Sequence, residues 1–268
     1  MGRRLRVRSR TGDLGLGAVF VAALAFLYLP IAVLVGLSFN ESGLPTAWGG
    51  FSTKWYSELA RDEEIKSAAV ATMTVALAAT GLSVLIGTPL AFGLARLRSR
   101  LLDGLVFVPM IIPDIVLAIA LLSGFNLVFT QKLGLQLGLW SVVLAHATFG
   151  IAFVAIVVST RLAHFDHSTV EASLDLGASE SRTFLHVTLP QIAPGVIAGA
   201  LIVFTLSVDE FVIAYFTAGI EITLPIKIYS MVRFGVTPVV NALATVVLGL
   251  SIALVLASMR LRGRQAAS

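Results

Sequence analysis

The sequence contains no cysteine and is poor in charged residues. Without cysteine the chain has no disulfide framework, no thiolate metal site and no cysteine nucleophile. Only 13% of its 268 residues are charged and 57% are hydrophobic, whereas soluble domains contain roughly 25% charged residues. This composition is typical of a protein that lies in a lipid bilayer.

The sequence also lacks the short motifs of several enzyme classes. It has no G-x-x-x-x-G-K-[ST] phosphate loop, so the chain is not expected to bind and hydrolyse ATP in that way. The G-x-S-x-G and H-E-x-x-H motifs are absent as well, which argues against a hydrolase within the membrane. The net charge of +4 does not indicate a nucleic-acid binder, because the arginines lie in short clusters between apolar runs. We therefore expect no enzyme, no nucleic-acid partner and no cofactor in this chain.

Six apolar segments are long enough to span a bilayer as helices. A hydrocarbon core of about 30 Å needs about 20 helical residues, because each residue rises about 1.5 Å. The segments cover residues 14–39, 67–95, 104–130, 133–160, 194–219 and 238–259. The first is too long for a signal peptide and no small-residue cleavage site follows it, so we interpret it as an uncleaved span. The sequence predicts an all-α membrane protein with six transmembrane helices in one domain, residues 1–268.

The basic residues predict how these spans are oriented. Thirteen of the nineteen Lys and Arg residues flank the spans on one side, which the positive-inside rule makes cytoplasmic. These are Arg3, Arg4, Arg6, Arg8, Arg10, Arg96, Arg98, Arg100, Arg161, Arg182, Arg260, Arg262 and Arg264. Both termini are then cytoplasmic, as is the loop 161–190. Loops 40–66, 131–132 and 220–237 face outward.

The cytoplasmic loop 161–190 has the pattern of two short helices. Ser168 and Glu171 have the spacing of a capping box, which predicts a helix start at Ser168. Gly177 offers a left-handed stop for that helix. A second helix is predicted over 179–187, with Pro190 closing it.

This pair of short helices has two interpretations. An amphipathic helix with Val170 and Leu174 on one face can dock into a groove of a partner. Alternatively, the loop only packs against its own helix bundle. The physical pattern alone leaves both interpretations open.

The loop resembles the signature of ATP-binding-cassette (ABC) importer permeases. That signature is an EAA triplet, three residues, Gly, nine residues and then Ile-x-Leu-Pro; Ser173 replaces the third Ala and Val187 the Ile. In that family the loop forms the coupling helix, which sits in a cleft of the cytoplasmic ATPase subunit and transmits its closure. By this resemblance the coupling positions are Glu171, Ala172, Ser173, Gly177, Leu189 and Pro190.

The last third of the sequence resembles spermidine/putrescine permeases, specifically the second of their two permease subunits. The segments SVDEFVIAYFTAG (207–219) and TLPIKIYSMVRFGVTPVVNALAT (223–245) carry this resemblance. It implies the type I ABC importer permease fold and transport of polyamines or a related small cation. Ferric-ion, opine, sulfate and molybdate importers share parts of the pattern, so another small solute is an alternative.

The resemblance also implies partners and a location. The partners are a pair of ATPase subunits that hold ATP and Mg, a second permease, and a periplasmic or lipid-anchored solute-binding protein. The chain is expected to be a multi-pass protein of the bacterial inner membrane. An ion-coupled secondary carrier is the rival class, but its usual mark, an internally repeated pair of broken helices, is not evident in the sequence.

Three acidic residues fall within predicted spans. Asp209 and Glu210 lie in the fifth, and Asp114 lies at a comparable depth in the third. An ionised carboxylate at a helix centre costs roughly 2.5 to 3.5 kcal/mol, so such residues usually face a cavity or a partner. We expect them to line a translocation path for a cation. In the alternative interpretation, Ser, Tyr or backbone groups satisfy them and they only hold helices together.

Other residues near these acids have weaker signals. Phe211 and Tyr215 can attract a cation through their rings, although aromatic residues in a span more often pack. Pro109 and Pro113 interrupt backbone hydrogen bonds just before Asp114, which is tolerated where a helix is buried or lines an aqueous path.

The histidines do not predict a metal site. His164 and His167 flank Asp166 on a short loop, but they lack a third ligand and a supporting shell. His146 lies within an apolar span, where a lone histidine usually makes an interhelical hydrogen bond. We therefore expect no metal.

Overall fold

The structure is a computed structural model that describes residues 10–44, 47–97, 99–163, 165–233, 235 and 237–265. Within these residues the chain folds into helices and connecting segments, with one isolated β-bridge between Asn40 and Phe51. The prediction of an all-α protein is confirmed. The contacts divide the chain into two compact units, one formed by Met1–Glu63 with Ser230–Ser268 and the other by Glu64–Tyr229. The prediction of a single domain stays a prediction.

Five helices among the described residues are long and apolar enough to cross a membrane. They cover Gly15–Ser38, Glu63–Leu97, Asp114–Leu133, Leu139–Leu162 and Glu180–Asp209. The sixth predicted span, residues 238–259, lies within one helix, Pro238–Gln265, whose part Pro238–Leu250 is apolar where its side chains are described. The count of six and the cytoplasmic placement of both termini stay predictions, and Arg3, Arg4, Arg6, Arg8 and Arg98 lie outside the described residues.

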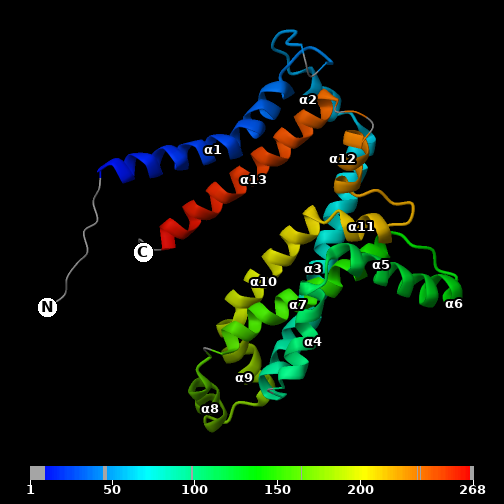
Figure 1. The fold of residues 1–268 in the computed structure, drawn as a ribbon. Coiled ribbons are helices and arrows are strands. Elements are labelled where there is room, and N and C mark those ends of the chain that lie inside the picture. Colours follow the sequence, from blue (N-terminus) through cyan, green and yellow to red (C-terminus); the bar gives the residue numbers. More distant parts are fainter. Residues whose placement is uncertain are drawn as a thin grey trace. The chain divides into compact units, whose positions relative to one another are not determined.

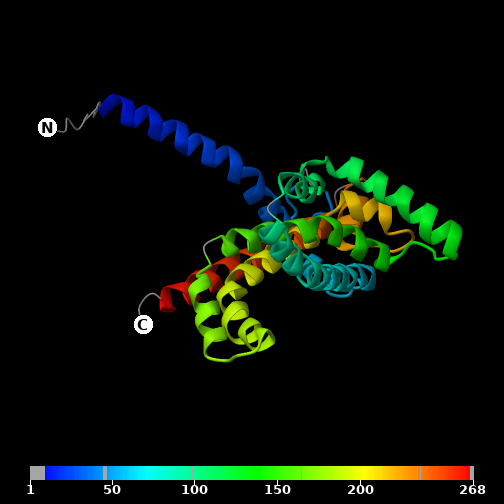
Figure 2. The ribbon, with the colours of Figure 1, turned by 90° about the horizontal axis from the view of Figure 1, so that it is seen from below.

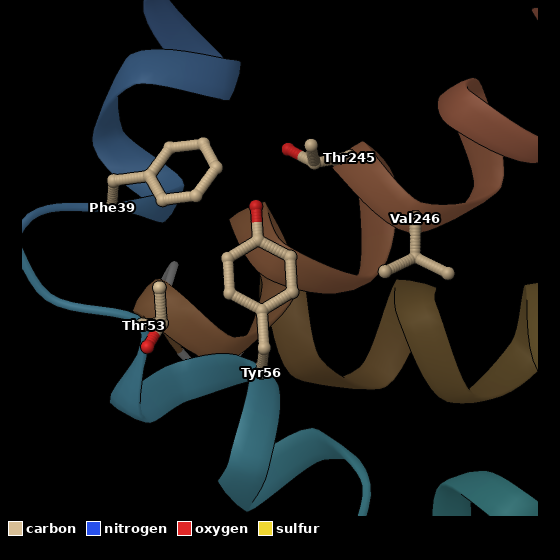
Figure 3. A pocket seen from close by; sticks show the side chains of 5 residues that line it. All are labelled: Phe39, Thr53, Tyr56, Thr245 and Val246. Atoms are coloured by element: carbon tan, nitrogen blue, oxygen red, sulfur yellow. The ribbon is translucent and has the colours of Figure 1, made fainter.

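The first unit contains α1 (Arg10–Ser38), α2 (Lys54–Leu59) and α13 (Pro238–Gln265). Helices α1 and α13 pack against each other, and α2 contacts α13 (Figure 1). Asn40 organises the loop between α1 and α2, because its Oδ1 accepts the backbone N–H of Gly49 at 2.8 Å and its Nδ2 donates to the carbonyl of Ala47 at 2.8 Å. The unit holds an apolar depression of about 400 Å³. Figure 3 shows its lining residues, Phe39, Thr53, Tyr56, Thr245 and Val246.

The second unit is built around α7 (Leu139–Leu162), the most buried of the long helices. It packs against α4 (Arg100–Ile111), α5 (Asp114–Phe125), α10 (Leu189–Asp209) and α11 (Val212–Thr217) (Figure 1). The other elements are α3 (Glu63–Leu97), the π turn η1 (Asn126–Thr130), α6 (Gln131–Leu133), α8 (His167–Asp175), α9 (Glu180–Thr183), the π turn η2 (Phe184–Thr188) and α12 (Leu224–Arg233).

A glycine and a polar pair let α7 approach its neighbours. A Cβ on Gly150 would lie 2.3 Å from the hydroxyl oxygen of Ser83 and 2.8 Å from a methyl of Val203, so only glycine fits between α3 and α10. One turn away, His146 Nδ1 and the hydroxyl of Ser207 form a buried hydrogen bond of 2.7 Å. Small residues and side-chain hydrogen bonds are the usual means of packing helices in lipid. The interhelical bond predicted for His146 is confirmed.

The predicted third span, residues 104–130, is not one helix. Helix α4 ends at Ile111 and α5 begins at Asp114, while Ile112 adopts an extended conformation with ψ of 133°. The ring of Pro113 disfavours helical geometry at Ile112 and provides no N–H for the ladder. The break therefore places Asp114 at the start of a helix rather than in the middle of one.

The predicted fourth span, residues 133–160, begins later than expected. Gly134 has φ of 67° and ends α6, and α7 starts only at Leu139. The connection lies at 134–138 rather than 131–132. The sequence did not predict this turn, because the apolar residues 135, 137 and 139 continue the hydrophobic segment and hydropathy does not indicate that Gly134 is left-handed.

The predicted fifth span, residues 194–219, differs at both ends. Helix begins at Glu180 and runs through η2 into α10, which ends at Asp209. Glu210 leaves the helix with ψ of 111°, and α11 starts at Val212. The prediction that Pro190 closes a short helix is wrong: Pro190 is the second residue of α10, and the π turn η2 just before α10 accommodates the missing N–H within a continuing helix.

Candidate functional site

The first candidate site is α8, which carries the EAA-like triplet. Its cap is Asp166, not Ser168: one carboxylate oxygen of Asp166 accepts the backbone N–H of Ser168 at 3.0 Å and its hydroxyl at 2.7 Å. The predicted capping box between Ser168 and Glu171 is therefore wrong. A carboxylate is a strong acceptor and is favoured by the positive end of a helix, so Asp166 takes the capping position. Both hydrogen bonds from Ser168 lower the pKa of Asp166, and the bond from the side-chain hydroxyl has the larger effect.

The end of α8 follows the prediction. Gly177 has φ of +83°, the left-handed conformation expected at a helix stop. Its backbone N–H donates to the carbonyl of Leu174 at 2.9 Å, and the N–H of Ala178 donates to the carbonyl of Ser173 at 3.1 Å. Ser179 then caps α9. The sequence thus folds locally into a helix, a tight turn and a second helix start.

The outer surface of α8 is open to a partner. Glu171 and Ala172 are exposed, and Leu174 and Leu176 are 42% and 90% exposed. Ser173 is half-buried. Further along, Leu189 is half-buried and Pro190 is exposed. The predicted coupling positions therefore lie on two segments, with Glu171, Ala172 and Ser173 on α8 and Leu189 and Pro190 at the start of α10. Figure 1 and Figure 2 show the ribbons of these helices.

The second candidate site lies at the break between α10 and α11. Asp209 is exposed at the end of α10, and Glu210 is half-buried at the break. Glu210 Oε1 accepts the backbone N–H of Ile213 at 2.9 Å. Asp209 and Glu210 were both predicted to lie within the fifth span, but only Asp209 is helical, because Glu210 has an extended conformation after the end of α10.

The structure brings Asp114 to this break. Helices α5 and α11 pack against each other through Leu117, Ala118 and Ile213, and the carboxylates of Asp114 and Glu210 are close enough to interact electrostatically. Each lies at a helix start, where the dipole favours negative charge. The helix breaks therefore explain how these acids are tolerated in an apolar sequence.

Aromatic rings gather beside the acids. Phe211 lies 5.5 Å from Tyr215 and 4.7 Å from Tyr229, and the two tyrosine rings are 6.0 Å apart, measured between ring centroids. Tyr215 and Tyr229 are 48% and 43% exposed. Sequence reasoning did not identify Tyr229, because it lies in a segment predicted to be an outward loop.

Helix α12 positions Tyr229 through contacts with α3. Lys227 forms an ion pair with Glu64, and the backbone N–H of Leu224 donates to the Thr72 hydroxyl at 2.7 Å. These partners are separated by more than 150 residues in sequence. No local pattern in the sequence signals this arrangement.

No metal centre was predicted, and His164, one of the two histidines weighed for it, lies outside the described residues. Where side chains are described, no group of three or more His, Asp or Glu residues is placed to hold a metal ion.

Residues 79–264 match the protein family described as "Binding-protein-dependent transport system inner membrane component". The chain is 45% identical over 252 residues to the spermidine/putrescine transport system permease protein PotC of Escherichia coli (strain K12), covering 92% of this chain and 93% of that protein. It is 42% identical over 238 residues to the putrescine transport system permease protein PotI of the same strain, covering 86% of this chain and 84% of that protein.

A solved structure has the same fold. A chain of a bacterial ABC transporter involved in the import of the acidic polysaccharide alginate aligns with a TM-score of 0.70 at 17% identity. The alignment covers 97% of this chain and 99% of that chain. At this identity the likeness concerns the fold alone.

Proposed function

We propose that this chain, which belongs to the family of binding-protein-dependent transport system inner membrane components, is a permease subunit of an ABC importer for polyamines. Its relatives named for spermidine and putrescine transport cover more than four-fifths of the chain at over 40% identity, which supports the substrate class. In this function the chain forms the translocation path together with a second permease in the bacterial inner membrane. It is a transport component and not a catalyst.

Energy reaches the chain through α8. The exposed side chains of Glu171, Leu174 and Leu176 form a mixed acidic and apolar surface that suits a groove in an ATPase subunit. ATP and Mg are bound by the ATPase pair, because this sequence has no phosphate loop. Closure of that pair displaces α8, and the attached helices then switch the side to which the path opens.

The solute site lies at the helix breaks, and one observation carries this assignment. Asp114 and Glu210 lie at the starts of α5 and α11, two helices that pack against each other, beside the aromatic group of Phe211, Tyr215 and Tyr229. Carboxylates offer charge-assisted hydrogen bonds to an ammonium group, and aromatic faces attract it at roughly 0.5 to 2 kcal/mol. Asp209 adds a further exposed carboxylate at the end of α10. Such a site selects a small organic cation over an anion.

The outward surface receives the solute from a binding protein. The predicted outward loop contains Trp48, Trp55 and Tyr56, and the acidic run 62–64 follows it. Trp55 is fixed by a hydrogen bond of 2.7 Å from its Nε1 to the carbonyl of Asn40. A loop held in this way offers a defined surface for a periplasmic or lipid-anchored partner.

A secondary carrier is the second candidate, because the two breaks at 112–113 and 210–211 resemble the discontinuous helices of such proteins. One experiment separates the candidates. The chain is reconstituted in proteoliposomes with its second permease, the ATPase pair and the binding protein, and uptake of labelled spermidine and putrescine is measured with ATP or with an ion gradient alone.

ATP-dependent uptake that is lost in Glu171→Arg is the expected result. ATP-dependent activity without polyamine uptake would retain the importer and overturn the substrate. Uptake that needs only an ion gradient would overturn the ABC assignment of the mechanism.

A further inference from the structure

The helix that leads from the coupling segment into α10 contains one weak joint. In the π turn η2 (Phe184–Thr188) the backbone hydrogen bonds join residues five apart rather than four apart as in an α-helix. Pro190, just beyond this turn, supplies no N–H. The ring N–H of His186 donates to the carbonyl of Arg182 at 3.0 Å. Helices bend at π-bulges and prolines, so a force applied to α9 can be lost here as bending rather than passed to α10.

Helix α8 makes one side-chain hydrogen bond on each side of this joint. Before it, the hydroxyls of Ser173 and Thr183 are 3.0 Å apart, and Thr183 is the last residue of α9. Beyond it, Gln191 Nε2 donates to the hydroxyl of Thr169 at 2.9 Å. Thr169 and Ser173 are four residues apart in α8, so both lie on one face. The two bonds therefore span η2.

We propose that Thr169 and Ser173 splint η2, so that α8, α9 and the start of α10 move as one body. They are positioning residues, since nothing in this role requires contact with a solute. Ser173 stands where the ABC permease signature has its third alanine, and an alanine there has no hydroxyl to bond Thr183. Thr183 is only 3% exposed, so water competes little for this bond. The inference rests on the proposed function, because it takes α8 to be the coupling helix.

The first test measures the coupling ratio, which is ATP hydrolysed per solute imported, in the reconstituted complex. Ser173→Ala and Thr169→Val each remove one bond with little change in volume. We expect each to raise the ratio about fivefold, which is ~1 kcal/mol at 1.4 kcal/mol per tenfold and corresponds to one hydrogen bond. Ser181→Ala is the matched control, because Ser181 is an exposed serine in α9. An unchanged ratio in both variants overturns the proposal.

The second test does not depend on the solute. Hydrogen–deuterium exchange of residues 184–188 in the assembled complex reports on the joint itself. We expect faster exchange in Ser173→Ala and Thr169→Val, and unchanged exchange in Ser181→Ala. If exchange rises but the native complex does not import polyamines, the proposed substrate fails and the splint stands. If exchange is unchanged, or rises without any change in the coupling ratio, the splint is overturned.

Discussion

The carboxylate of Glu210 caps the start of α11 by accepting the backbone N–H of Ile213 at 2.9 Å. The same carboxylate is close enough to Asp114 for the two to interact electrostatically. Glu210 therefore has a structural contact, and in the proposed function its charge also attracts the cation; suitable substitutions separate the two roles. Glutamine keeps an accepting oxygen and loses the charge, whereas alanine loses both.

Glu210→Gln is expected to lower polyamine uptake about tenfold, ~1.4 kcal/mol, and to leave the melting temperature of the purified complex unchanged. Glu210→Ala is expected to lower uptake equally and also to destabilise the complex by ~1 kcal/mol, the usual cost of a lost cap. Labelled-solute uptake and thermal unfolding measure the two effects. Normal uptake by the Gln variant would leave Glu210 with a capping role only.

Tyr229 is expected to act through its ring rather than its hydroxyl. Its ring lies 4.7 Å from that of Phe211 and 6.0 Å from that of Tyr215, between centroids. Tyr229→Phe keeps the aromatic face and is expected to bind polyamine within about twofold of the native complex, whereas Tyr229→Leu is expected to bind about fivefold more weakly, ~1 kcal/mol. Equilibrium binding of labelled spermidine measures this. Equal loss in both variants would assign the effect to the hydroxyl.

Gly150→Ala is expected to destabilise the second unit by about 1 to 3 kcal/mol, the usual cost of overpacking. The new methyl would lie 2.3 Å from the Ser83 hydroxyl oxygen and 2.8 Å from Val203, so α7 must move. Gly81→Ala is the matched control, because a Cβ there meets nothing within 4 Å. Thermal unfolding in detergent compares the two. A Gly150→Ala protein as stable as the control would show that α7 and its neighbours adapt without cost.

The cap of α8 is expected to weaken in acid. The folded-state pKa of Asp166 is below its ordinary value of 3.8 because of its hydrogen bonds from Ser168. A lowered carboxyl pKa stabilises the fold above the unfolded pKa, and this contribution is lost as the pH falls through the folded value. Hydrogen exchange of residues 167–170, corrected for intrinsic rates, should therefore accelerate below 3.8. Asp166→Asn keeps a capping oxygen and should abolish this pH dependence. A persisting dependence in that variant would place the titrating group elsewhere.

Hydropathy located most of the helices because a helix in lipid needs a minimum apolar length, which is a property of the sequence. The bounds of the first two predicted spans, 14–39 and 67–95, agree with those of α1 and α3 to within a few residues. The end of α8 was also predictable from the sequence, because Gly177 can adopt the left-handed conformation that ends the helix. The cap was predicted incorrectly because Ser168 and Asp166 are both good capping residues, and the charged one prevailed.

The sequence by itself determined the helical class, the approximate spans and the helix-turn-helix of the coupling segment, because each depends on residues near one another in the chain. The tertiary structure decided where helices break, and which distant groups meet at the breaks. Asp114 comes near Glu210 only because α5 packs on α11, and Tyr229 reaches Phe211 while Thr72 and Glu64 hold α12. These are contacts between residues far apart in sequence, and no local pattern encodes them. Packing alone brings them together.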